Sequence, residues 1–187
     1  METICRLNNH IATFEYQSWG VCGAMVCSWI KAIRSGKSVA TPSDIGSVGS
    51  MILVQHEAMK ASDEEEGKLA IFRRNGINLR NKFEFSARGT KALFSPDRLA
   101  SAALAPGYSY LSISWLDDED EPAQHALGVV SQADEWLLCD PNFFLWKFTN
   151  QHEFVHSLTS LLSGHGLPPD VPNGPYPVLS GAIYYLH

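Results

Sequence analysis

Three side chains of the kind used in thiol chemistry stand far apart in the sequence: Cys22, His125 and Asp140. Cys22 lies in a glycine-flanked stretch, Gly20 to Gly23, where a loop is predicted to become a helix. The unpaired N–H groups and the positive dipole end of a first helical turn favour a thiolate over a thiol at such a position. Cys22 is therefore the candidate nucleophile.

Three further features could support that nucleophile. His125 begins the apolar segment 125–130 and is expected at the mouth of a strand, where an imidazole can take up the thiol proton and later protonate a leaving amine. Asp140 ends the following predicted strand, and adjacent antiparallel strands bring such ends together, so its carboxylate can orient the ring. Gln17, five residues before Cys22, can offer its amide N–H to an oxyanion alongside the Cys22 backbone N–H.

Each of these residues also has an ordinary structural interpretation. Most free cysteines are buried as small hydrophobic residues, and Asp-Pro-Asn is common turn chemistry. A non-enzymatic binding module on the same fold therefore stays open as an alternative. So do deamidases, transglutaminase-like enzymes and acyltransferases, because a thioester serves all of them and the cleft selects the acceptor.

A competing motif occupies residues 152–156, which read H-E-x-x-H, the pattern of two zinc-binding imidazoles with a glutamate as general base. The two histidines fall on the flank of the predicted helix away from its apolar stripe, which suits a solvated face. A third ligand is hard to find, since the metzincin position is Leu162 and either His165 or Asp170 would need an irregular return of the chain. We expect an ordinary amphipathic helix here, and thiol chemistry that needs no metal and no cofactor.

Three segments resemble the YopT/AvrPphB-type cysteine proteases, papain-fold effectors of bacterial pathogens and symbionts. They are residues 17–30 (QSWGVCGAMVCSWI), 124–127 (QHAL) and 140–143 (DPNF). By this resemblance Cys22 is the nucleophile, His125 the general base and acid, Asp140 the orienting carboxylate and Gln17 the oxyanion-hole side chain. Trp29 matches an aromatic residue that follows the nucleophile on the same helix, and we interpret it as a packing residue.

The sequence departs from the family pattern at two positions. Phe144 stands where the family commonly has a glycine, and at the oxyanion position asparagine is more usual than Gln17. Bacteriocin-processing peptidases carry a similar order of Gln, Cys, His and Asp-Pro. The resemblance implies a peptidase that acts on a protein inside a target cell. It also implies delivery by a specialised, non-Sec apparatus, with a secretion chaperone or a cognate inhibitor as further partners; a resident cytoplasmic protein would look the same.

The first half of the chain is predicted to be mostly helical. Apolar residues at three- and four-residue steps predict an amphipathic helix over residues 22–34. Further helices are expected over residues 43–60 and 68–74, with the acidic cluster 63–66 as a solvated loop between them. Ser95-Pro96 resembles an N-cap followed by proline, which opens a small helix that ends near Pro106.

After Gly107 the pattern changes to strands. Residues 108–115, 125–131, 135–139 and 145–148 are expected to pair as an antiparallel meander, with turns at 117–122 and 132–134. A helix follows from Asn150 to Gly164, and a Pro/Gly-rich tail over 167–177 leads to a last strand at 182–186. We therefore predict a single α+β domain over residues 1–187, with a papain-like fold whose helical N-terminal half packs on the sheet.

Composition excludes several classes of function. The 187 residues carry 14 basic and 20 acidic side chains, a formal charge of −6, and 45% of them are hydrophobic. This balance predicts a globular domain without the basic stripe that nucleic-acid binding needs. The N-terminus lacks the apolar core of a secretory signal peptide, and the longest uncharged run, 99–116, is broken by Pro106-Gly107, so no stable membrane insertion is expected. Four cysteines without paired spacing favour free thiols.

Overall fold

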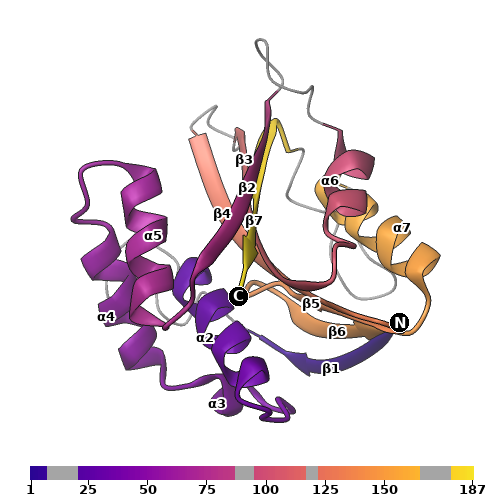
Figure 1. Cartoon of the computed structure of the whole chain (residues 1–187), viewed down its shortest axis with the longest axis horizontal. Coiled ribbons are helices and arrows are strands. Elements are labelled where there is room, and N and C mark those ends of the chain that lie inside the picture. The colour runs from indigo at the N-terminus through magenta and orange to yellow at the C-terminus, as the bar shows by residue number, and fades with distance from the viewer. Residues whose placement is uncertain (8–20, 87–94, 117–121, 165–177) are drawn as a thin grey trace.

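The computed structural model describes residues 1–7, 21–86, 95–116, 122–164 and 178–187. Within these ranges the chain forms seven strands and six helices (Figure 1). The strands are β1 (Glu2–Arg6), β2 (Leu79–Ser86), β3 (Gly107–Leu116), β4 (Pro122–Gln132), β5 (Glu135–Cys139), β6 (Phe144–Phe148) and β7 (Ser180–Leu186). The helices are α2 (Cys22–Arg34), α3 (Pro42–Ile45), α4 (Val48–Ala58), α5 (Glu64–Arg74), α6 (Pro96–Ala102) and α7 (Gln151–Leu162).

All seven strands belong to one antiparallel sheet in the order β1-β6-β5-β4-β3-β7-β2. The centre is the predicted meander from β3 to β6. The C-terminal strand β7 adds beside β3, and β2 pairs with β7 to form one edge. In the β3–β4 pair Ile113 lies opposite His125, so the position of this histidine in the sheet is fixed by continuous pairing on one side.

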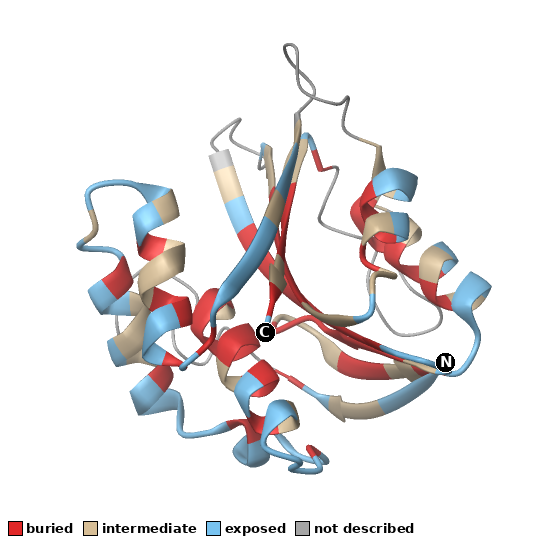
Figure 2. Ribbon diagram, viewed as in Figure 1, coloured by how far each residue is buried: buried red, intermediate tan, exposed pale blue. Residues whose placement is uncertain are grey.

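The sheet separates two hydrophobic cores. One core joins the helices α2 to α5 to one face, and the other joins α6 and α7 to the opposite face (Figures 1 and 2). Alternation along β3 shows the division, because Tyr110 packs in the first core while Leu111 and Ile113 pack in the second. The strands of the centre are buried on both faces.

Helix α2 lies close against β4 because β4 has a glycine at the point of contact. A Cβ atom added to Gly128 would stand 2.7 Å from Cζ3 of Trp29 and 3.0 Å from Cγ1 of Val26. The Trp29 ring, which is fully buried, thus occupies the space of a missing side chain. Trp29 is a packing residue, as predicted, and this contact sets the height of α2 over the strand that carries His125.

Most predicted elements are confirmed. Helix α2 has the predicted bounds, α6 begins at Pro96 after Ser95, and the strands β3 to β7 and helix α7 occupy the predicted segments within a few residues. The α+β prediction, with a helical first half packed on an antiparallel sheet, is confirmed at this level. The prediction of a turn at residues 117–121 and of a Pro/Gly-rich tail at 167–177 concerns residues outside the described ranges.

Three predictions for the first half are wrong. The expected order of helices followed by strands misses β1 and β2, which form the two edges of the sheet. The helix expected over 43–60 is two helices, since Gly46 has a φ of 144° that no helix contains and Ser47 then caps α4. The acidic cluster 63–66 is not a loop, because Asp63 is the N-cap of α5 and its glutamates form the first turn. Within the described residues no helix is long and apolar enough to cross a membrane.

Candidate active site

The structure brings His125 and Asp140 into direct contact. Nε2 of His125 donates a hydrogen bond of 2.8 Å to Oδ1 of Asp140, and both side chains are almost wholly buried. The contact follows from the β4–β5 hairpin, in which Gly128 pairs with Cys139, so that the residue after Cys139 lies beside the start of β4. The predicted juxtaposition of a strand start and the end of the next strand is confirmed.

A turn holds the Asp140 carboxylate in place. The backbone N–H of Phe143 donates to the carbonyl oxygen of Asp140 at 3.0 Å, and the N–H of Asn142 donates to Oδ1 of the same residue at 2.9 Å. This is the Asx-type geometry that an Asp-Pro-Asn sequence favours. Phe144 begins β6 and accepts the Asp140 N–H at 3.0 Å, so a phenylalanine is compatible with the turn at this position.

Cys22 is the first residue of α2 and is partly exposed. Burial raises the pKa of its thiol, but this effect is outweighed. A hydrogen bond to His125 and the charge of that ring, together with hydrogen bonds from the N–H groups of Ala126 and Gly23, lower the pKa below its ordinary value of 9.0. Because His125 Nε2 is bonded to Asp140, Nδ1 is the ring nitrogen left to exchange a proton with the thiol.

The sulfur lies against an edge of β4 that lacks a strand partner among the described residues. The pairing of β4 with β5 ends at Gly128, whereas β4 itself begins at Pro122. Ala126 lies in this extension, and its backbone N–H is one of the groups that lower the pKa of the Cys22 thiol. The extension of β4 beyond its pairing with β5 thus contributes to the stability of the thiolate.

The three side chains form a coupled ion-pair system. Burial lowers the pKa of His125, but the charge and hydrogen bond of Asp140 and the contact with Cys22 together raise it to about 10. Because the pKa of the thiol lies below 9.0 and that of the imidazole is about 10, a proton shared by the two groups lies on the imidazole, so thiolate beside imidazolium is favoured over the neutral pair. An arrangement of this kind supplies a nucleophile, a proton donor and a group that orients the donor.

The other three cysteines do not share this environment. All four thiols are free, as predicted. Burial raises the pKa of Cys27 and of Cys139, which are fully buried, and it raises that of Cys5, which is partly exposed. Cys22 is therefore the one cysteine of the four whose pKa is lowered.

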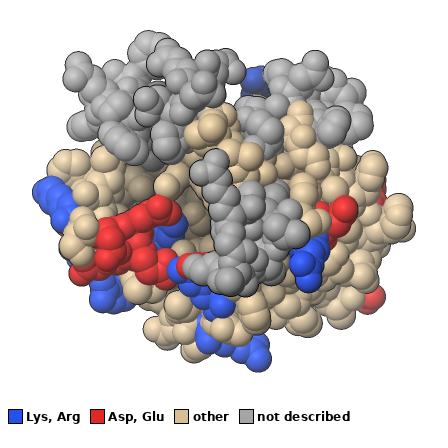
Figure 3. Space-filling model, turned by 90° about the horizontal axis from the view of Figure 1, so that it is seen from above, with Lys and Arg blue, Asp and Glu red and all other residues tan. Residues whose placement is uncertain are grey.

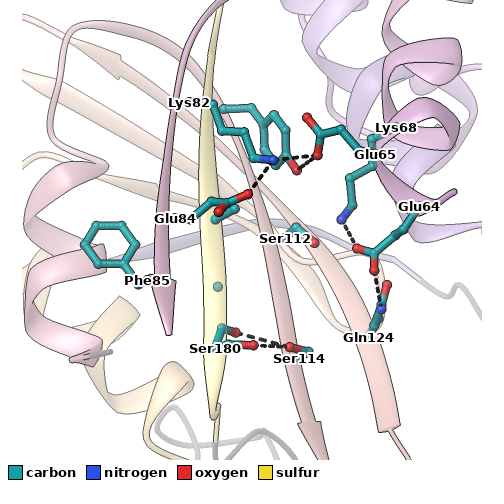
Figure 4. A pocket seen from close by; sticks show the side chains of 13 residues that line it. Glu64, Glu65, Lys68, Lys82, Glu84, Phe85, Ser112, Ser114, Gln124 and Ser180 are labelled. Carbon is teal, nitrogen blue, oxygen red and sulfur yellow. Dashed lines mark hydrogen bonds and ion pairs between the residues drawn. The ribbon is translucent and has the colours of Figure 1, made fainter. Parts of the chain in front are cut away.

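A polar pocket of about 350 Å³ lies between α5 and the sheet. Gln124, which precedes His125 on β4, is one of the residues that line it. Figure 4 shows that Lys82 bridges Glu65 and Glu84, while Glu64 joins Lys68 to Gln124. Figure 3 shows a group of acidic side chains with basic side chains beside it on one face of the molecule.

One hydroxyl group that lines this pocket, that of Ser112, has no partner among the other lining side chains. Ser112 is nine-tenths buried and lines the pocket from β3, and its hydroxyl makes no hydrogen bond to another described side chain in the pocket (Figure 4). The neighbouring Ser114 is bonded to Ser180 at 2.6 Å. Three carboxylates against two ammonium groups give the pocket a net negative charge.

The zinc-motif residues lie elsewhere. His152 and His156 are exposed on α7, and both carboxylate oxygens of Glu153 bind the N-terminal ammonium group at 2.7 Å. The Glu153 backbone N–H donates to the Asn150 side chain, as expected for a cap. Among the described residues no group of three metal-ligating side chains occurs. His165 and Asp170 lie outside those residues.

Gln17, the predicted oxyanion donor, also lies outside the described ranges. Sequence reasoning missed the Ala126 N–H, the pocket residues and Gln55, whose side chain reaches the first turn of α2 from α4. The signal for Ala126 was present in principle, since a strand longer than its neighbour leaves N–H groups unpaired. For Gln55 the sequence holds no comparable signal.

Comparison with known proteins gives a match at the level of the fold. No protein-family model matches the sequence, and no curated protein matches it significantly. The structure is similar to the crystal structure of the Pseudomonas avirulence protein AvrPphB, with a TM-score of 0.63 over 94% of this chain and 94% of that chain. The sequence identity is 16%, so the similarity establishes a shared fold.

Proposed function

We propose that this protein is a papain-like cysteine peptidase with Cys22 as nucleophile, His125 as general acid and base, and Asp140 as the group that orients the ring. The observation that carries the proposal is the position of His125, whose Nε2 binds Asp140 at 2.8 Å and whose ring is close enough to Cys22 to lower the pKa of that thiol. The fold shared with AvrPphB and the motif resemblance to the YopT/AvrPphB-type proteases support it.

In the proposed mechanism each group has a defined step. The Cys22 thiolate attacks the carbonyl carbon of a peptide bond, and the electron pair of the carbonyl moves to its oxygen. The Cys22 N–H at the start of α2 and the Gln17 amide stabilise this oxyanion. His125 then gives its proton to the leaving amine, which leaves a thioester. Neutral His125 next takes a proton from water, whose oxygen attacks the thioester and releases the acid and the thiolate.

The substrate is a polypeptide that crosses the start of β4. The pocket between α5 and the sheet then receives one of its side chains. The net negative charge of the pocket and the Ser112 hydroxyl favour a side chain that donates hydrogen bonds. By analogy with the effector family, the protein acts inside a target cell after delivery by a specialised secretion system.

Alkylation by iodoacetamide, resolved by mass spectrometry for each cysteine, tests the nucleophile. Cys22 should react near neutral pH much faster than Cys5, because the pKa of one thiol is lowered and that of the other is raised. His125→Ala should slow the reaction of Cys22. Equal rates at Cys5 and Cys22 would contradict the proposal and favour a binding module.

Incubation with a proteome-derived peptide library tests the reaction. New peptide termini should appear with the wild-type protein and with Cys5→Ala, and should be absent with Cys22→Ala. Loss of ammonia from glutamine side chains without new termini would instead identify a deamidase. Products joined to added primary amines would identify a transglutaminase-like enzyme.

A further inference from the structure

The helix that carries Cys22 begins without a cap of its own. Its N-cap residue is Val21, whose hydrocarbon side chain makes no capping bond, and its first turn contains no acidic residue. The helices α4, α5 and α7 are built differently, since their N-cap side chains accept the N–H three residues on. These three caps are Ser47, Asp63 and Asn150.

The N–H groups at the start of α2 have other partners. The first bond within the helix runs from the Met25 N–H to the Val21 carbonyl oxygen at 2.8 Å. Of the N–H groups before it, that of Gly23 is among the groups that lower the pKa of the Cys22 thiol. The Ala24 N–H donates to Oε1 of Gln55 at 3.1 Å, and Gln55 belongs to α4, 31 residues away. The missing cap is thus supplied by a neighbouring helix.

Gly23 makes room for this contact. A Cβ atom at Gly23 would stand 3.2 Å from Oε1 of Gln55, 3.0 Å from the Tyr110 hydroxyl oxygen and 3.2 Å from Cδ1 of Ile71. About nine in ten real Cβ contacts are wider than these, so a side chain at this position would press against the Gln55 amide. The glycine after the nucleophile therefore allows a side chain from α4 to reach the backbone of α2.

The charge of the cap matters here because it lies beside a thiolate. A carboxylate is a strong N-terminal cap, yet a negative charge near Cys22 would disfavour the anionic sulfur. Within the described part of the chain, the titratable groups that act on Cys22 are His125 from β4, Tyr110 from β3 and Cys27 from α2 itself. Burial raises the pKa of Tyr110 and that of Cys27, so both are neutral at pH 7.

Other charged groups lie further out on the helices that pack against α2. The charge of Glu64 on α5 contributes to the raised pKa of Tyr110, and His56 and Glu57 of α4 are exposed. We propose that Gln55 is a positioning residue for the nucleophile: its uncharged amide oxygen caps α2 through Ala24 and holds the first turn in place without putting an anion beside Cys22. This inference rests on the proposed role of Cys22.

The test compares Gln55→Glu with Leu53→Glu by the pH dependence of Cys22 alkylation. Glutamate keeps the length and the acceptor of Gln55 but adds a charge at the first turn, whereas Leu53 is 66% exposed on the same helix. Gln55→Glu should raise the pKa of Cys22 by about one unit, which lowers the thiolate fraction about tenfold below that pKa. Leu53→Glu should leave it unchanged.

A second variant separates capping from charge. Gln55→Met removes the acceptor and adds no charge, so the pKa of Cys22 should stay near the wild-type value while kcat/KM for a cleaved peptide falls several-fold. An unchanged pKa in Gln55→Glu, an equal shift in Leu53→Glu, or wild-type kcat/KM in Gln55→Met would each overturn the inference. If Cys22 of the wild-type protein has an ordinary pKa, the proposed function itself fails.

Discussion

At the scale of single residues, Asp140 is the side chain whose charge the site depends on most. Asp140→Asn keeps an acceptor for Nε2 of His125 and for the Asn142 N–H, but it removes the negative charge. The pKa of His125 should fall from about 10, because burial lowers it and the Asp140 charge that raises it is gone. The pKa of Cys22 should rise as the imidazolium is lost, and alkylation at pH 7 should slow at least about tenfold.

The matched control for this change is Asp134→Asn, which removes a charge from the exposed turn between β4 and β5. Cys22 of this variant should be alkylated at the wild-type rate. An unchanged rate of Cys22 alkylation in Asp140→Asn would show that the buried carboxylate does not determine the protonation of Cys22 and His125.

The same two residues predict the pH profile of peptide cleavage. The thiolate forms as the pH rises through the pKa of Cys22, which lies below 9.0, and the imidazolium is lost as the pH rises through about 10. Since acyl transfer needs both, kcat/KM should rise and then fall, with the falling limb near pH 10. Alkylation of Cys22 needs no proton donor and should reach a plateau instead. A cleavage profile with the same plateau would contradict the assignment of His125 as the acid.

At the scale of secondary-structure elements, the distance between α2 and β4 depends on Gly128. Gly128→Ala would place a Cβ atom 2.7 Å from the Trp29 ring, and the buried ring has little room to move. We expect the free energy of unfolding to fall by about 1–3 kcal/mol in urea titrations. Cys22 alkylation should slow in the folded protein as well, because α2 shifts relative to His125.

Gly49→Ala provides the control for that substitution. Gly49 lies in the first half of α4, and a Cβ atom there would meet no atom within 4 Å. This variant should have a stability equal to or slightly above the wild type, because alanine favours a helix. Equal effects of the two substitutions would mean that the contact with Trp29 does not govern the position of α2.

Sequence patterns predicted the elements that are buried on one side or on both. The helix α2 and the strands β3 to β6 have strong apolar periodicity, and turn chemistry marked the Asp140 segment. The edge strands β1 and β2 were missed because edge strands carry exposed and charged residues, which hide the alternation. The acidic start of α5 was missed because the same glutamates suit a loop and a first helical turn equally well.

The candidate site likewise contains residues that the sequence predicted and contacts that it did not. Cys22, His125 and Asp140 could be placed from the sequence because each lies near the end of a predicted helix or strand. The geometry of an antiparallel hairpin then predicts that His125 and Asp140 lie close together. The contact between Gln55 and Ala24, and the pocket between α5 and the sheet, depend on how separate helices pack. Local patterns do not contain that information, since the partners are distant in the chain and ordinary in type.

At the scale of the whole molecule, the sheet keeps two kinds of candidate chemistry apart. Helix α2 packs in the core on one face, whereas α7, with its H-E-x-x-H motif, packs in the core on the other (Figure 1). Glu153 binds the N-terminal ammonium group in a partly exposed ion pair, and such pairs contribute about 0–1 kcal/mol. Its environment is that of a surface contact.

Glu153→Gln should therefore leave peptide cleavage within about twofold of the wild-type rate and lower stability by no more than such a pair contributes. Incubation with a chelator should not change cleavage, while Cys22→Ala should abolish it. His152→Ala is the matched control, because that side chain is exposed on the same helix. Loss of cleavage in both α7 variants, together with inhibition by the chelator, would place the reaction on the opposite face of the sheet and refute the thiol mechanism.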